Sequence, residues 1–357
     1  MFYNCKNITS IDLTEFNINS VVNMSYMFYS CSSLTIIKFK NVKAFDVKDM
    51  SHMFHGCSSL NPSNLNNYFD TSQVTNMAYM FCNTKLSSFN FREFNVNKVK
   101  NMGSMFSSCS SLNSITLYSS KLIVTNIESM FSYCNKLNSL DFNHFSTSEV
   151  TNMRSLFSGC SKLTSVISLD TSKVENMENM FSNTKLSSFD FNIYNLISVT
   201  NMKNMFNGCS SLNSINLINS KQSNIIMEEM FSGCTKIISL DFTRFDTSLV
   251  KNMKGMFEGC TSLTSISNLN TSSATNMESM FENTGFSSFN LDIFDISNVN
   301  NMKYMFSKCK SLTTVNFGNS NSNSRQVTNI AYMFSGCSKL EKLNFKNFIT
   351  SNVVDMS

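Results

Sequence analysis

The chain has 357 residues, of which 42% are hydrophobic, and its 28 basic and 24 acidic residues leave a formal net charge of +4 at pH 7. This hydrophobic content is ample for a core and argues against disorder. The charges are interspersed and form no Lys/Arg run of the kind that follows a nucleic-acid backbone. No stretch approaches about 18 consecutive apolar residues, which excludes a membrane-spanning helix within this window. We therefore expect a folded segment with no nucleic-acid partner and no membrane span.

The dipeptide Met-Phe, or its variant Leu-Phe, recurs fourteen times at intervals of 24 to 28 residues. A strict period of this length is typical of stacked repeats, in which each unit packs only on its neighbours. The phenylalanines of the dipeptide are Phe2, Phe28, Phe54, Phe81, Phe106, Phe131, Phe157, Phe181, Phe206, Phe231, Phe257, Phe281, Phe306 and Phe334.

Both ends of the sequence lie inside repeats. Met1-Phe2-Tyr3 is already the middle of one and does not resemble a signal peptide, and Asn352–Ser357 stops within another. Solenoids need polar end units to cover their terminal cores, and neither end has one. The sequence therefore predicts a single uncapped solenoid over residues 1–357, with about 14 repeats, as a segment of a longer protein.

Each repeat begins with a segment that predicts a short strand. Around Leu137, Leu140 and Phe142 the pattern Leu-x-x-Leu-x-Phe alternates in the way expected of a strand with one buried side. Equivalent segments surround Ile115, Phe189, Ile215, Leu240 and Leu343. Because one short strand is not stable alone, we expect these strands to pair as a parallel sheet.

The second segment changes period. The apolar residues Val150, Met153, Leu156 and Phe157 recur every three to four positions, which favours one or two turns of helix. The predicted fold class is therefore an α/β repeat, with one short parallel strand and one short helix in each unit of about 25 residues.

A longer period lies above the first. Residues 81–180 and 181–280 align without a gap, and 281–357 begin a third, partial copy of this four-unit block. The third copy loses register at residues 318–325, a Ser/Asn-rich stretch that predicts a surface loop.

The run Thr-Ser-x-Val-x-Asn-Met-x-x-Met-Phe-x-x-Cys-x-x-Leu resembles the BspA-type leucine-rich repeats of bacterial and protist surface proteins. Val74–Phe81 and Val199–Phe206 match it well, and the resemblance covers essentially the whole chain. It implies a right-handed leucine-rich-repeat solenoid and adhesion to host matrix, host cells or other microbes, and it carries no catalytic residues to transfer. One departure is that Phe145 and Phe245 replace the Asn or Cys of the general pattern, so the internal hydrogen-bond ladder must lie elsewhere.

Asparagine is the predicted ladder. It stands four residues before the Met of the dipeptide in most repeats, with Asp49 and Ile226 as substitutes. We interpret its amide as satisfying backbone groups in the bend and bonding to the next repeat's Asn, and Ile226 as a weak rung. The alternative, ligand binding, needs this column to face solvent.

Cysteine and methionine are interpreted as core residues. Eleven of the twelve cysteines fall three residues after the repeat Phe, as Cys134 and Cys160 do, and Thr84, Thr184 and Thr284 take that place once per block. The first interpretation is that these thiols are free and fill apolar space in the core, and the second is that stacked neighbours form disulfides. A zinc site is disfavoured, because it needs four converging ligands. We expect no metal, no cofactor and no enzymatic activity.

Two polar columns on the solvent side of the predicted sheet are the candidate binding site. One interpretation is that the columns are simply a solvated sheet face. The other is that they form an extended, shallow binding surface for protein or glycan. Because this surface lacks aromatic or Arg anchors, it would bind multivalently. Its residues are Ser88, Asn90, Ser114, Thr116, Ser139, Asp141, Ser188, Asp190, Ser214, Asn216, Ser239, Asp241, Ser288 and Asn290.

The sequence thus favours a non-enzymatic adhesion or display module at a cell surface. One alternative is an intracellular scaffold for protein–protein interaction, since twelve thiols are unusual in a secreted chain. Another is a passive stalk that displays other domains.

Overall fold

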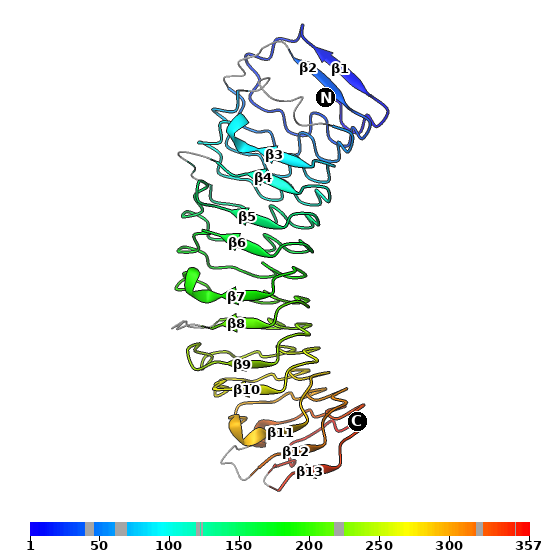
Figure 1. Cartoon of the computed structure of the whole chain (residues 1–357), viewed down its shortest axis with the longest axis vertical. Coiled ribbons are helices and arrows are strands. Elements are labelled where there is room, and N and C mark those ends of the chain that lie inside the picture. The colour runs from blue at the N-terminus through cyan, green and yellow to red at the C-terminus, as the bar shows by residue number, and fades with distance from the viewer. Residues whose placement is uncertain are drawn as a thin grey trace. The chain divides into compact units, whose positions relative to one another are not determined.

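The computed structural model describes residues 1–39, 46–60, 70–118, 122, 124–217, 225–318, 324–346 and 348–357. The chain forms two compact units, an N-terminal unit of Met1–Val174 and a C-terminal unit of Glu175–Ser357. In each unit successive repeats pass as rungs of a parallel β-solenoid (Figure 1), so that residues about 25 positions apart lie side by side.

In the N-terminal unit the strands pair in parallel within each couple of rungs. They are β1 (Ser10–Leu13) with β2 (Ile36–Phe39), β3 (Ser88–Asn90) with β4 (Ser114–Thr116), and β5 (Ser139–Asp141) with β6 (Ser165–Ile167). The predicted strands around Ile115 and Leu140 are therefore confirmed.

The C-terminal unit repeats this arrangement. Here β7 (Ser188–Asp190) pairs with β8 (Ser214–Asn216), β9 (Ser239–Asp241) with β10 (Ser265–Ser267), and β11 (Ser288–Asn290) with β12 (Thr314–Asn316), which also pairs with β13 (Lys342–Asn344).

The short helix predicted in each repeat is wrong. The segment from the ladder Asn to the Cys, here called the turn segment, is a chain of tight turns, as when Met27 N–H donates to Met24 O at 3.3 Å. Alternate amides bond to the next rung instead, as Met24 N–H does to Asp49 O at 2.9 Å. Between them Tyr26 is left-handed, with φ of 57°. An α-helix needs every amide bonded four residues back within one segment, and these inter-rung bonds exclude that.

The ladder residues hold the turn segments in register. Each forms a parallel bridge with its counterpart in the next rung, from Asn23 through Asp49 to Asn76 and on to Asn152 in the N-terminal unit. In the C-terminal unit bridges connect Asn176, Asn201 and Ile226, and then Asn252 through Asp355. The rung is thus fixed at two places, the strand and the ladder residue.

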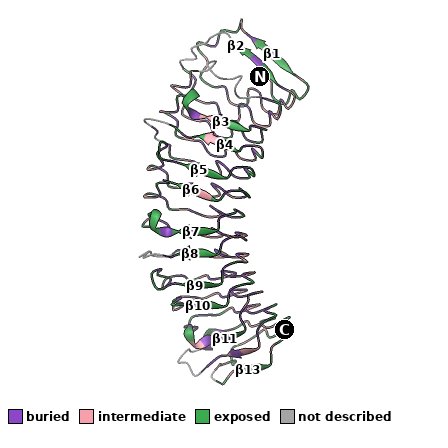
Figure 2. Ribbon diagram, in the orientation of Figure 1, coloured by how far each residue is buried: buried purple, intermediate pink, exposed green. Residues whose placement is uncertain are grey.

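The core of each rung lies between its strand and its ladder residue, and the buried residues that form it are coloured purple in Figure 2. Phe106, Phe131 and Phe157 stack face to face at 5.9 Å and within 4° of parallel, and all three are fully buried. Met105 and Met130 of the dipeptide are also fully buried. The prediction that the Met-Phe column is core is therefore confirmed, and the spacing of the rungs allows the rings to stack.

Each four-unit block has a 3-10 helix at the same place. A 3-10 helix of three residues follows the first strand of each block, as η2 (Phe91–Glu93), η3 (Phe191–Ile193) and η4 (Leu291–Ile293). Another 3-10 helix, η5 (Ser324–Gln326), follows the stretch that departs from the block. Over the described ranges, none of the helices has the length and apolar character needed to cross a membrane.

Two predictions about organisation stay predictions. The surface loop at residues 318–325 lies largely outside the described residues, which resume at Ser324. That residues 1–357 form a single uncapped solenoid also stays a prediction, because the chain divides into two units.

Candidate functional site

The strand face is the set of side chains at the first and third positions of each strand. The middle residue of the strand points into the core, as Leu140 and Leu240 do, and its neighbours point outward. From β3 to β6 and from β7 to β11 the first positions form a serine column. The third positions of these strands, apart from Ile167 and Ser267, form an Asn/Asp/Thr column, here called the Asx column. The predicted residues Ser88, Ser114, Thr116, Ser139, Asp141, Ser188, Asp190, Ser214, Asn216, Ser239, Asp241, Ser288 and Asn290 are exposed, and Asn90 is half-buried.

Strand pairing brings these residues together two rungs at a time. In the N-terminal unit Ser88 lies beside Ser114, and Asn90 beside Thr116. In the C-terminal unit Ser188 lies beside Ser214, and Asp190 beside Asn216, whose Nδ2 donates to Asp190 Oδ1 at 3.0 Å. The columns are therefore continuous hydrogen-bonding surfaces over each strand pair.

The Asx column also has a local structural task. Asn90 Oδ1 accepts the Arg92 N–H at 3.0 Å and Asp190 Oδ1 accepts the Asn192 N–H at 2.9 Å, so both cap the 3-10 helix that follows. Asp141 and Asp241 accept the backbone N–H two residues on in the same way, at 2.9 and 3.0 Å. This is the ordinary Asx turn, which explains why Asn and Asp dominate the column. Only the remaining lone pairs and amide hydrogens are available to a partner.

Asp241 is the most strongly hydrogen-bonded carboxylate of the face. Its Oδ1 accepts Asn268 Nδ2 at 2.9 Å, Thr243 Oγ1 at 2.7 Å and Ser267 Oγ at 3.0 Å. These donors, the Asn268 amide first, hold the pKa of Asp241 well below its usual range. The carboxylate is therefore a fixed acceptor and not a proton donor.

The sequence interpretation missed the fourth rung of each block. Ser165 pairs with Ser139 and Ser265 with Ser239, so both continue the serine column. Ile167, at the third position of β6, is 51% exposed and adds an apolar spot where the other rungs are polar. The signal was present, because Leu163-Thr164-Ser165-Val166 fits the strand pattern.

The columns themselves contain no aromatic or Arg residue from β3 to β6, but a cluster of such residues lies beside them in the N-terminal unit. Arg92 and Tyr118 lie two residues after the Asx column, and His144 three residues after it, in successive rungs. The Arg92 Cζ lies 4.9 Å from the centre of the Tyr118 ring, whose centre is 6.1 Å from that of His144. All three side chains are exposed. Their adjacency follows from stacking and is invisible in a sequence where they stand 26 residues apart.

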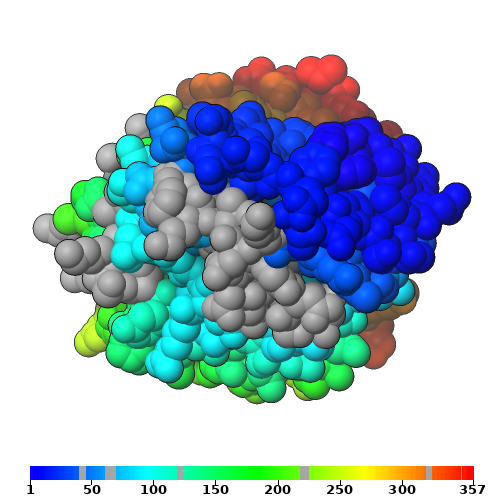
Figure 3. Space-filling view, turned by 90° about the horizontal axis from the view of Figure 1, so that it is seen from above, coloured from blue at the N-terminus to red at the C-terminus, as the bar shows by residue number. Residues whose placement is uncertain are grey.

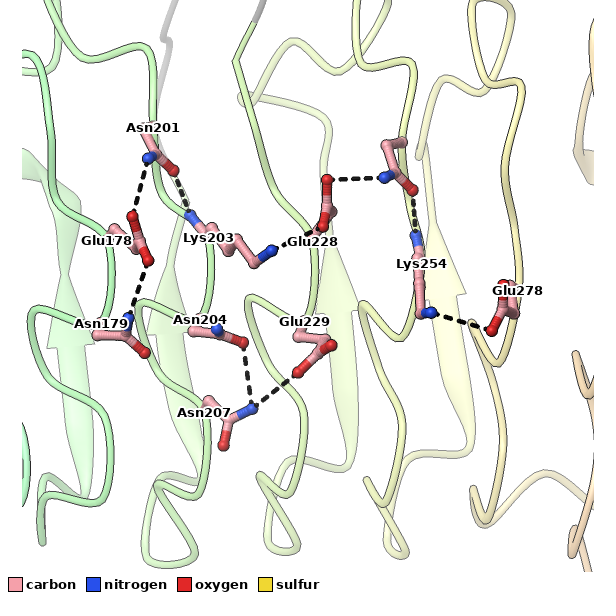
Figure 4. A network of polar contacts seen from close by, with 11 residues as sticks. Glu178, Asn179, Asn201, Lys203, Asn204, Asn207, Glu228, Glu229, Lys254 and Glu278 are labelled. Atoms are coloured by element: carbon pink, nitrogen blue, oxygen red, sulfur yellow. Dashed lines mark hydrogen bonds and ion pairs between the residues drawn. The ribbon is translucent and has the colours of Figure 1, made fainter.

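A second polar surface runs along the turn segments. Two residues after the ladder residue, eight rungs carry charges that alternate in sign within each unit. They are Glu128 and Arg154 in the N-terminal unit, and Glu178, Lys203, Glu228, Lys254, Glu278 and Lys303 in the C-terminal unit. In the N-terminal unit a cross-rung ion pair joins Arg154 to Glu128 at 3.1 Å. In the C-terminal unit such pairs join Lys203 to Glu228 and Lys254 to Glu278, each at 3.0 Å (Figure 4).

The ladder asparagines have the predicted backbone role but a different side-chain partner. Asn201 Oδ1 accepts the Lys203 N–H at 3.0 Å, as the prediction requires. Its Nδ2 donates to Glu178 at 3.4 Å instead of to another Asn, and Asn152 donates to Glu128 at 3.1 Å in the same manner. At Ile226 the side chain is 43% exposed and borders a recess lined also by Leu249 and Lys251.

The thiols offer no reactive site in the core. All twelve cysteines are free, and Cys134 and Cys160 are fully buried, so the apolar-filler interpretation is confirmed. The thiols of Cys134 and Cys160 also donate to the previous rung, to Phe106 O at 3.2 Å and to Phe131 O at 3.0 Å. Burial raises the pKa of Cys160 to about 12, which keeps it protonated. Among the described residues no three His, Cys, Asp or Glu side chains converge as metal ligands.

A family model matches this chain along its length. The family described as "Mycoplasma protein of unknown function, DUF285" matches residues 1–120, 125–237, 225–322 and 294–357. No curated protein sequence matches the chain.

Solved structures show the same fold. A leucine-rich repeat protein from Bacteroides ovatus is similar with a TM-score of 0.67 and 20% identity, over 99% of this chain and 85% of that one. A leucine-rich repeat protein from Eubacterium ventriosum is similar with a TM-score of 0.50 and 16% identity, over 94% of this chain and 78% of that one. The leucine-rich-repeat solenoid implied by the sequence is therefore confirmed as a fold.

Proposed function

This chain belongs to the family described as "Mycoplasma protein of unknown function, DUF285", and we propose that it is a non-enzymatic binding module whose strand face contacts protein or glycan multivalently. The fold gives such a module a regular surface, because each added rung repeats the same two outward positions.

The observation that carries the proposal is the register of the serine column. Ser88 with Ser114, Ser139 with Ser165, and Ser188 with Ser214 lie side by side on the solvent side of their strands. The core already has its apolar residues at the middle strand positions, so these outward hydroxyls are not needed for packing. They are donors and acceptors at the same time, which suits the amide groups of a peptide and the hydroxyls of a glycan alike.

The affinity of one rung for a partner is small on this proposal. Hydroxyl and amide contacts on an open face displace water that already satisfies them, so each contributes little net free energy. Contacts repeated along one partner raise the effective concentration of the next contact. Arg92, Tyr118 and His144 add one stronger contact in the N-terminal unit, since Arg and Tyr are common anchors in protein interfaces.

Adhesion at a cell surface is the biological setting that we propose for this module. Its support is the resemblance to the BspA-type repeats, whose characterised members are surface adhesins. The intracellular scaffold and the passive stalk remain the alternatives, and the second of these predicts no binding by the strand face.

The test changes the serine column at equivalent positions of the two units. The variant S114K/S214K places a cation on each strand face and leaves the Asx caps intact. The matched control S110K/S210K adds the same charge at exposed positions outside the strands. Retention is measured on immobilised extracellular-matrix proteins and on a glycan array. We expect retention to fall at least tenfold for the strand variant only. Equal retention by both variants would reject the strand face as the contact surface.

A further inference from the structure

The outside of the turn segments in the N-terminal unit carries two stacks of aromatic rings. The first contains Tyr26, His52 and Tyr79, three residues after their ladder residues, with ring centres 4.4 and 4.5 Å apart and planes within 8°. The second contains Tyr3, Tyr29 and His55, one residue after the repeat Phe, at 4.8 and 4.6 Å.

The two stacks form one surface, here called the aromatic patch. Tilted contacts join them within a rung, at 5.5 Å between Tyr26 and Tyr29 and at 5.7 Å between His52 and His55. Tyr3 is 58% exposed, Tyr26 42% and Tyr79 39%, while the other rings are half-buried. The rungs that carry the patch belong to the blue to light-blue end of the chain, which faces the viewer in Figure 3.

The backbone under the first stack disfavours these side chains. Tyr26, His52 and Tyr79 have φ of 57°, 56° and 58°, in the left-handed region that bulky residues avoid. At the same position in the C-terminal unit the chain places Asn179, Asn204 and Gly255, residue types that tolerate this conformation, beside the less tolerant Glu229, Tyr304 and Tyr332. The rings therefore stand at positions where the local backbone prefers something else.

The fold does not depend on these rings. In the following rungs of the same unit the position is taken by Ser104, Ser129 and Ser155, with φ of 54° to 55°. Under those serines the core stack of Phe106 and Phe131 continues unbroken at 5.9 Å. An unfavourable residue that the scaffold does not require points to a role at the surface.

The chemistry of the patch is that of an interface centre. Each ring is held by its stacked neighbours, so little side-chain freedom is lost when a partner binds. Stacking covers the ring faces and leaves the edges outward, and aromatic edges pack well on the faces of other aromatic rings. The three turn segments 23–31, 49–57 and 76–84 contain one formally charged residue, Asp49, whose Oδ1 already accepts the Ser51 N–H at 2.8 Å. Tyrosine-rich, charge-poor surfaces of this kind are typical of protein interfaces.

We propose that the aromatic patch is a second binding surface, separate from the strand face, and that its partner is a protein segment rich in aromatic residues and poor in charge. The partner's rings would lie face-on against the outward edges, and the tyrosine hydroxyls would bond to its backbone carbonyls. The matching low charge of the patch favours such a segment over an acidic or basic one.

The probe is a random dodecapeptide library displayed on phage. It is selected on the wild-type chain alone, and the variant Y26N/H52N/Y79N, which installs the residue found at positions 179 and 204, serves for comparison afterwards. Affinities of the enriched peptides are then measured by fluorescence polarisation. We expect enrichment of uncharged peptides containing Trp, Tyr or Phe, whose binding to the triple variant is at least tenfold weaker.

Two further variants make the result specific. Y304N/Y332N removes a stacked tyrosine pair of the C-terminal unit, with centres 5.2 Å apart, and should change affinity less than twofold. Y26F/Y79F keeps the rings without their hydroxyls and should retain most of the affinity. Peptides that bind the triple variant as tightly as wild type, enriched sequences that lack aromatic residues, or glycan-array binding that requires the patch would each overturn the proposal.

Folding of the triple variant is checked by a circular-dichroism melt. Because Asn suits the left-handed backbone, we expect a melting temperature close to that of wild type. If the triple variant does not fold, the single variant H52N decides the question, since it removes the ring that links Tyr26 to Tyr79. Unchanged affinity in a folded H52N chain would again reject the patch as a binding surface.

Discussion

The side-chain amide of Asn252 donates to Glu228 Oε1 at 2.7 Å, across the gap between two rungs. The other end of the same amide, its Oδ1, accepts the Lys254 N–H within its own rung at 3.1 Å. One ladder residue thus closes a turn and links two repeats. Because both partners lie at the edge of the core, water competes only in part for these hydrogen bonds.

We expect a polar residue at Ile226, the apolar position of the ladder, to increase the stability of the fold. Ile226→Asn supplies an acceptor for the turn and should raise the free energy of unfolding by about 0.5–1 kcal/mol. Asn201→Ala removes the same acceptor from a regular rung and should lower it by about 1–2 kcal/mol. Urea unfolding of both variants measures the difference. A destabilising Ile226→Asn change would mean that the recess around Ile226 needs an apolar side chain.

The thiols should differ sharply in reactivity. Cys5 is exposed, whereas Cys134 and Cys234 are fully buried and burial raises their pKa well above the ordinary value. Thiolate is the reactive form, so a native chain treated with an aromatic disulfide reagent at pH 8 should modify Cys5 first. All twelve cysteines should react once the chain is unfolded. Peptide mass spectrometry locates the modified residues, and early labelling of Cys134 would contradict the buried column.

A single ring of the core stack should be costly to remove. Phe131 is fully buried and lies between Phe106 and Phe157, each 5.9 Å away. Phe131→Ala leaves a cavity and should reduce the free energy of unfolding by about 3–5 kcal/mol. The control Phe131→Leu keeps most of the volume and should cost about 1 kcal/mol. Equal losses in denaturant titration would show that ring stacking, and not volume, dominates at this position.

The stability of the N-terminal unit should depend on pH through its stacked histidines. Burial lowers the pKa of both His52 and His55 below the ordinary 6.5. The neighbouring His52 lowers the pKa of His55 further, whereas the charge of Asp49 partly raises the pKa of His52. The unfolded chain therefore binds protons at a pH where the folded chain does not. Stability should be constant above the ordinary pKa and should fall as the pH drops below it, until the folded state is also protonated.

Thermal melts between pH 8 and pH 4 measure this dependence. The variant H52N/H55N should lose the part of the slope that lies just below pH 6.5, while its behaviour at pH 8 reports only the cost of removing the rings. An unchanged slope in the double variant would assign the pH dependence to carboxylates instead.

The alternating charges of the turn segments should contribute little to stability. Lys254 and Glu278 are 3.0 Å apart, but their side chains are 41% and 25% exposed. A double-mutant cycle with K254A and E278A should give a coupling free energy of about 0.5 kcal/mol, which 1 M NaCl largely removes. A coupling above about 2 kcal/mol would mean that the pair is better shielded from solvent than its exposure indicates.

The sequence was sufficient for those features that repeat with the period. Apolar residues at fixed positions are buried only if the rungs superpose, so the Met-Phe core, the strand segments and the outward Ser and Asx columns followed from spacing alone. The residues Ser165 and Ser265 were within reach of the same reasoning. The same reasoning could not rule out the helix that was wrongly predicted, because an apolar spacing of three to four residues is common to a helix and to a chain of tight turns. What separates them is where each amide finds its carbonyl.

Only the tertiary structure decided which side chains meet across rungs. Arg92, Tyr118 and His144 gather beside the strand face, Asn152 finds Glu128 instead of another Asn, and Tyr26, His52 and Tyr79 stack at a position where the backbone favours Asn or Gly. Each of these contacts joins residues about one repeat apart, whose relative height depends on the backbone bonds between rungs. The amino-acid sequence by itself determined the period and the identity of the core columns. The stacking of the rungs decided the turn geometry, the ladder partners and the aromatic patch, because non-local hydrogen bonds set the register in which side chains of different repeats come into contact.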